Sequence, residues 1–120
     1  MSNEIILTKY LRKIGIPTEI KGYYIIRSAV LLLIEQPDII MQGDMTRLLY
    51  PLLAREYKTT PSRVERAIRT AIEVTFAKDN TGYLQEVFGT VKPTNKAFLS
   101  LIADNLKIGL IEGDGDVSTD

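Results

Sequence analysis

The stretch that decides the fold is TTPSRVERAIRTAIEV, residues 59–74. Val, Ile and Ala recur in it at helical spacing, while three arginines and two glutamates lie on the same helix. On a helix that turns by about 100° per residue, Ile68, Ala71 and Thr75 fall close to Val64 and form one stripe. We expect this stripe to be buried. The opposite side carries Ser62, Arg66, Arg69, Thr70 and Glu73, with Arg63 and Glu65 at its margins.

The same helical period dominates the rest of the chain, and no segment shows the alternation typical of a strand. Helices are predicted over residues 4–14, 21–36, 45–57, 61–78, 83–88 and 94–106. Residues 21–36 are apolar nearly all round and are predicted to form the central buried helix. Pro51 falls inside the 45–57 pattern, so a kink or a later start is expected there. The predicted fold is all-α, a compact bundle of about six helices.

Charge is distributed unevenly along the chain. Residues 9–69 hold eleven Lys and Arg against six Asp and Glu, whereas residues 112–120 hold four acids and no base. The formal net charge of +0 therefore conceals a local positive field that can attract an anionic partner. Residues 1–110 are predicted to form one domain, and residues 111–120 an acidic, flexible tail.

Several function classes are excluded by composition. The chain has no Cys and no His, which removes disulfides, zinc fingers and the commonest general base. No carboxylate pair has supporting partners for acid–base catalysis, and no glycine-rich phosphate loop is present. We therefore expect no enzyme activity, no metal and no cofactor. The longest apolar run, residues 29–34, is too short to span a bilayer, and the N-terminus lacks a signal pattern. A cytoplasmic protein without a membrane partner is expected.

The helices predicted over 45–57 and 61–78, joined by the short turn KTTP, have the proportions of a helix-turn-helix. In that motif the second helix enters the major groove of DNA, with its N-terminal residues facing the base edges. Arginine matches guanine in a bidentate way, and glutamate can accept a hydrogen bond from cytosine. Ser62 and the free amides of the first turn suit a phosphate, and Lys58 precedes the turn where backbone contacts are expected.

Two local patterns concern the helix starts. Pro61 suits a first helical position, and Ser62 with Glu65 has the spacing of a capping box. Before the last predicted helix, Lys92 and its neighbours Thr94 and Asn95 either cap that helix or contact the DNA backbone.

A solvated face is the competing interpretation of the charged side. Glu65 and Arg69 form an ordinary i,i+4 pair worth about 0.3–0.5 kcal/mol. A bidentate base contact discriminates by about 1–3 kcal/mol, several times as much. The two interpretations therefore differ in a quantity that can be measured.

Residues 59–74 resemble the recognition helix of the C-terminal effector domain of the sporulation initiation response regulator family. IGIPTEIKGYYIIRSAV (14–30), LLYP (48–51), VFG (87–89) and KPTNKAF (92–98) match the same domain in the same order, so the resemblance covers about residues 5–106. It implies a six-helix DNA-binding domain of a transcription factor, reading a box that resembles TGTCGAA.

The resemblance also implies residue roles. Arg63, Glu65 and Arg66 match the base-reading positions, and Ser62 and Arg69 match positions near the DNA backbone. Lys58 and Lys92 are predicted as further backbone contacts. The family implies contact with the sigma subunit of RNA polymerase through residues 77–89, where this sequence diverges, and paired copies on tandem DNA boxes.

The sequence departs from the family pattern in two further ways. Family members usually carry an N-terminal receiver domain, for which these residues leave no room, so we expect either an excised domain or a standalone relative. The tail is acidic where the family's is basic. An alternative function follows from the neutral net charge and this tail: a protein-interaction module that docks on RNA polymerase or a related regulator without binding DNA.

Overall fold

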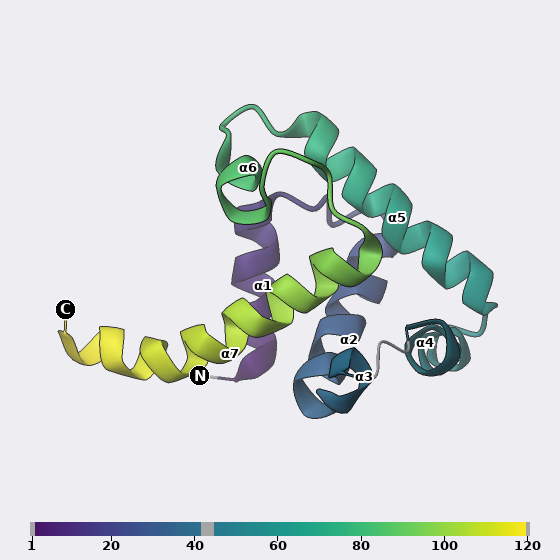
Figure 1. Cartoon of the computed structure of the whole chain (residues 1–120), viewed down its shortest axis with the longest axis horizontal. Helices are drawn as coiled ribbons and strands as arrows, with labels where there is room; N and C mark the ends of the chain where they lie inside the picture. The colour runs from purple at the N-terminus through teal and green to yellow at the C-terminus, as the bar shows by residue number, and fades with distance from the viewer. Residues whose placement is uncertain (1, 42–44, 120) are drawn as a thin grey trace.

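The computed structural model describes residues 2–41 and 45–119 (Figure 1). Every regular element in these residues is helical, which confirms the predicted all-α class. The elements are α1 (Asn3–Ile14), α2 (Lys21–Glu35), α3 (Asp38–Met41), the π-helical η1 (Met45–Leu49), α4 (Tyr50–Glu56), α5 (Pro61–Lys78), α6 (Tyr83–Phe88) and α7 (Asn95–Thr119). The predicted bounds of α5 and α6 agree with the structure residue for residue.

The helix α2 is the centre of the packing, as its apolar run predicts, since α1, α5 and α7 all contact it. Figure 1 shows α7 crossing α1 and α2 on one side. Gly22 marks the close approach of α2 to α5. A Cβ placed at Gly22 would lie 2.6 Å from the Ala67 carbonyl oxygen and 2.7 Å from the Ala71 Cβ. Because both separations are far below van der Waals contact, the observed crossing requires glycine at this position.

The predicted helix over residues 45–57 is divided into two elements. The α-helical part, α4, begins at Tyr50 with Pro51 in its first turn, so the later start is confirmed. The preceding turn, η1, is π-helical. The short helix α3 was not expected, because its four residues are too few to show a period.

The turn between α4 and α5 begins with a Schellman motif. The Thr59 amide donates to the Ala54 carbonyl oxygen at 2.9 Å, and the Lys58 amide donates to that of Arg55 at 3.4 Å. Lys58 has a φ of 53°, in the left-handed region that glycine usually occupies. The motif satisfies the last carbonyls of α4 and turns the chain into α5.

The start of α5 corrects one prediction. The Thr60 hydroxyl accepts a hydrogen bond from the Arg63 amide at 3.3 Å, and Pro61 is the first helical residue. Since Pro61 occupies the first position, the N-cap is the residue before it, Thr60. The predicted capping box of Ser62 and Glu65 is therefore wrong, and the Ser62 side chain stays exposed in the first turn.

At the other end of α5, aromatic rings join three helices. The ring centroids of Phe76 and Phe88 are 5.8 Å apart, and those of Phe88 and Phe98 are 4.9 Å apart. The helix α7 then runs to Thr119, well beyond its predicted end at residue 106. That prediction is wrong because an interior glycine, such as Gly109, costs a helix only about 1 kcal/mol and need not end it. Whether the acidic tail is flexible stays a prediction.

Candidate nucleic-acid interface

The inner face of α5 is the predicted stripe. Val64, Ile68, Ala71 and Thr75 are all buried. The one hydroxyl among them is satisfied, since the Thr75 side chain donates to the Ala71 carbonyl oxygen at 2.7 Å. Burial of this stripe fixes the rotation of α5 about its axis, and that rotation decides which side chains point outward.

The outer face of α5 presents the predicted reading residues to solvent. Ser62, Arg63, Arg66 and Arg69 are exposed, and Glu65 is partly exposed at the margin. Figure 1 shows α5 along one edge of the molecule, with its N-terminal end beside α4. No neighbouring helix in the described residues covers this end, so a large ligand can reach it.

A hollow flanks each side of this exposed edge. One hollow is lined by Lys21, Gly22, Arg63, Arg66, Ala67 and Thr70 together with Ile20 and Val74. The other is lined by Thr46, Tyr50, Pro61, Ser62, Glu65, Arg66 and Arg69. The N-terminal half of α5 therefore stands out as a ridge, with Arg66 bordering both hollows. A ridge of this kind fits a concave partner whose rims rise on both sides.

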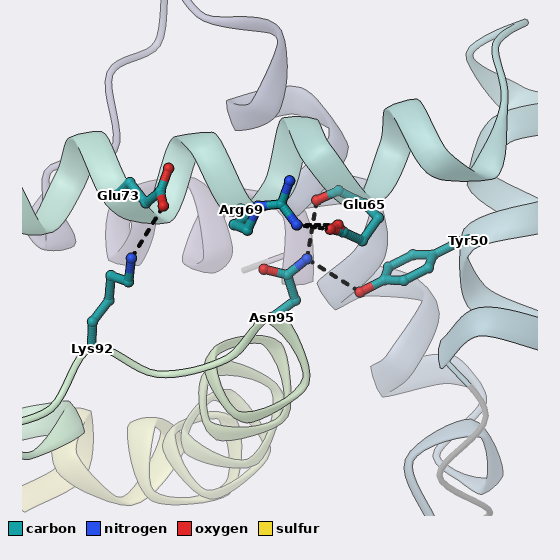
Figure 2. A network of polar contacts seen from close by, with 6 residues as sticks. All are labelled: Tyr50, Glu65, Arg69, Glu73, Lys92 and Asn95. Carbon is teal, nitrogen blue, oxygen red and sulfur yellow. Dashed lines mark hydrogen bonds and ion pairs between the residues drawn. The ribbon is translucent and has the colours of Figure 1, made fainter.

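Glu65 is held in place by Arg69, one turn further along α5 (Figure 2). The Arg69 Nη1 donates to both carboxylate oxygens of Glu65, with a distance of 2.9 Å to Oε2. The Arg69 side chain is 53% exposed and that of Glu65 is 28% exposed. The pair contributes only a few tenths of a kcal/mol to stability at such exposure. Its clearer effect is to restrict where the Glu65 carboxylate lies.

Lys58 lies at the entrance to α5 in a strained backbone conformation. A non-glycine residue in the left-handed region costs of order 1–2 kcal/mol, and such strain concentrates at functional sites. Its side chain is exposed, and it precedes α5 by only a few residues in the sequence. The conformation is accounted for by the Schellman motif, in which Lys58 is the left-handed residue that follows α4.

Lys92 lies on the loop before α7, beside the middle of α5 and not at its N-terminal end. It precedes α7 and pairs with Glu73 of α5 at 3.2 Å, two turns beyond Glu65 (Figure 2). Lys92 also borders a third hollow, which Arg69 and Lys96 line as well.

The structure thus brings most of the predicted site residues together in the N-terminal half of α5 and the turn before it: Lys58, Ser62, Arg63, Glu65, Arg66 and Arg69. It places Lys92 further along, beside an opposing carboxylate.

One contact beside α5, between Asn95 and Tyr50, was missed by the sequence analysis. Asn95 was expected to cap α7 or contact DNA, but Thr94 is the cap, accepting from the Ala97 amide at 3.1 Å. Asn95 instead donates to Tyr50 of α4 and to the backbone of α5 (Figure 2). Burial raises the pKa of the Tyr50 hydroxyl, against a smaller lowering by the Asn95 hydrogen bond. No local pattern could have predicted this contact, since the partners are far apart in the chain.

A helix-turn-helix whose second helix exposes arginines on a ridge has the arrangement found in DNA-binding domains. The chain matches the family model described as "Sporulation initiation factor Spo0A C terminal" over residues 7–106, and it belongs to this family. The family is a helical DNA-binding effector domain of sporulation and transcription regulation, and not an enzyme family. The match confirms the resemblance and its extent. No helix within residues 2–41 and 45–119 combines the length and apolarity needed to cross a bilayer.

Proposed function

We propose that α5 enters the major groove of duplex DNA and reads a TGTCGAA-type box, with Arg63, Glu65 and Arg66 at the base edges. The arginines supply bidentate donors for guanine, and the carboxylate accepts from the amino group of cytosine. In this role the domain acts in the cytoplasm as a sequence-specific transcription regulator, with two copies bound side by side on tandem boxes.

The observation that carries the proposal is the exposed ridge of α5 with a hollow on each side. A major groove about 12 Å wide admits one helix and brings a phosphate backbone along each flank. Ser62 and Arg69 lie toward one flank, where the exposed Ser62 hydroxyl adds a donor. The Arg63 amide is not available there, because it donates to the Thr60 hydroxyl. Lys58 at the turn and Lys92 beyond Glu73 are proposed as further backbone contacts.

The experiment is a gel shift at several salt concentrations with a TGTCGAA duplex and a scrambled duplex of equal length. Base reading requires tighter binding to the TGTCGAA duplex, and phosphate contacts require affinity for both duplexes to fall as salt rises. Equal affinity for both would remove the base-reading assignment. Failure to bind either duplex would favour a domain that docks on RNA polymerase or a related regulator without binding DNA.

Contact with the sigma subunit of RNA polymerase is a second proposed role, through residues 77–89. This segment comprises the C-terminal end of α5 and α6, where Lys78, Gln85 and Glu86 are exposed. An 18-residue helix is about 27 Å long, so the segment lies well away from the reading end. A protein could therefore be bound there while α5 occupies DNA. Charge-reversing substitutions at Lys78 and Glu86 should then lower sigma binding and leave the gel shift unchanged.

A further inference from the structure

We propose that Asn95, at the start of α7, is a positioning residue for base reading, because it holds α5 at a fixed inclination to α4. This inference rests on the proposed function. It concerns a side chain that is not proposed to touch DNA.

The side-chain amide nitrogen of Asn95 links α7, on which it lies, to both α4 and α5. Its Nδ2 donates to the Tyr50 hydroxyl of α4 at 3.2 Å and to the Glu65 carbonyl oxygen of α5 at 3.1 Å (Figure 2). Both protons of the amide are therefore used, one on each helix of the helix-turn-helix. A change in the angle between α4 and α5 would lengthen or break at least one of these bonds.

The position of Asn95 is itself fixed. The Thr94 hydroxyl caps the first turn of α7, and Phe98 and Leu99 of the next turn are fully buried. Tyr50 is also buried, being 7% exposed. Since both ends of the contact sit on packed elements, Asn95 transfers the rigidity of the core to α5.

The contact point lies at the centre of the reading residues. The Glu65 carbonyl belongs to the same two turns as Arg63 and Arg66, and the Glu65 carboxylate is restrained by Arg69. A bidentate base contact depends on alignment, and supporting hydrogen bonds must hold such groups within about 0.5 Å. Loss of the Asn95 contact should therefore weaken discrimination between bases. Attraction to phosphate, which tolerates misalignment, should remain.

The chain offers a matched control on the same helix. Asn105 of α7 donates to the Tyr10 hydroxyl of α1 at 3.1 Å, in a second Asn–Tyr contact distant from α5. In both cases burial raises the pKa of the tyrosine, with an asparagine hydrogen bond opposing the rise. The two contacts thus share their chemistry and differ in whether they touch the helix-turn-helix.

The experiment compares the parent chain with Asn95→Ala and Asn105→Ala. For each, the ratio of Kd for a scrambled duplex to Kd for a TGTCGAA duplex is measured at one salt concentration, alongside the melting temperature. Asn95→Ala should lower this ratio by about threefold to tenfold, the factor that one or two net hydrogen bonds supply. Its affinity for scrambled DNA should stay unchanged. Asn105→Ala should leave the ratio at the parent value.

Two further variants separate positioning from stability. Asn95→Asp keeps a favourable residue at the helix start but removes both donated bonds, so its ratio should fall as well. Tyr50→Phe removes one acceptor and should give a smaller fall. If Asn95→Ala and Asn95→Asp lower the melting temperature but retain the parent ratio, the role of Asn95 is overturned while the proposed function stands. If the parent itself fails to discriminate, the proposed function is overturned and this inference with it.

Discussion

Arg66 is the arginine that borders both hollows beside the α5 ridge, which places it at the centre of the proposed reading surface. Lys58, at the turn, is placed at an edge instead. The two residues therefore predict different consequences when their charges are removed: a base contact carries sequence information, whereas a phosphate contact does not.

Arg66→Ala should weaken binding to the TGTCGAA duplex by about 1–3 kcal/mol and relax the preference at one base pair. The reason is the loss of one bidentate contact while the buried stripe of α5 is untouched. Both effects are measured by the affinities of the parent and the variant for a set of duplexes that each differ from the box at one base pair. Arg12→Ala, which removes an exposed arginine of α1 that borders neither hollow, is the control. A substitution at Arg66 that weakens all variants equally would show a backbone contact instead.

Lys58→Gly should stabilise the fold by about 1 kcal/mol, because glycine adopts the left-handed conformation without strain. The same change should weaken binding to all duplexes alike and reduce the salt slope by about one. Denaturant unfolding and binding at several salt concentrations measure the two effects. Lys58→Arg keeps the charge and should retain binding. A glycine variant that binds scrambled DNA as tightly as the parent would contradict the assignment.

At the scale of elements, local signals predicted α5 and α6 well and contacts between elements poorly. Pro61 marks the start of α5, and the period of 3.6 residues set its buried and exposed faces. That the exposed residues touch DNA stays a prediction. Asn95 and Tyr50 are 45 residues apart, and no spacing within one helix indicates such a pair. The close approach at Gly22 was missed for the same reason, since the sequence alone does not show which helices cross.

Gly22→Ala should destabilise the fold by about 1–3 kcal/mol, because the new methyl group would displace α5 from α2. The displacement should also lower discrimination between the TGTCGAA and scrambled duplexes. Gly82→Ala is a useful comparison: its Cβ would meet nothing within 4 Å, and the cost comes from a φ of 78° alone. That variant should lose stability yet keep the parent discrimination. Equal stability of Gly22→Ala and the parent would refute the tight crossing.

At the scale of the whole molecule, α7 unites the elements, since it contacts α1, α2 and α5. Its two asparagines reach Tyr10 and Tyr50, on opposite parts of the fold. Global stability should therefore respond to the ionisation of these two tyrosines.

Stability should fall as pH rises above about 10. Burial raises the pKa of Tyr10 and Tyr50 above their ordinary value of 10.0, so the unfolded chain releases these protons first. Their contribution is fully present below pH 10.0 and is lost as pH rises through the folded-state pKa. Urea unfolding across this range measures the fall. A Tyr10→Phe/Tyr50→Phe variant should show a shallower dependence, and an identical slope would contradict the prediction.

Removing residues 113–120 should tighten DNA binding at low salt. Residues 112–120 hold four acids and no base, and their field opposes that of the basic surface. The gain should vanish at high salt, where exposed charges are screened. An Asp114→Asn/Asp116→Asn variant keeps the length of the chain and should show part of the gain. Unchanged affinity for DNA after the deletion would show that the acidic residues of the tail do not weaken DNA binding.

The separation of the two faces of α5 has a consequence for how this domain can diverge. Val64, Ile68 and Ala71 maintain the fold, while positions 62, 63 and 66 face outward. Mutations can accumulate on the outer set without unfolding the protein, so the surface that we propose reads DNA can change while the fold is kept. A library randomised at those outer positions should yield altered operators in clones that melt near the parent temperature.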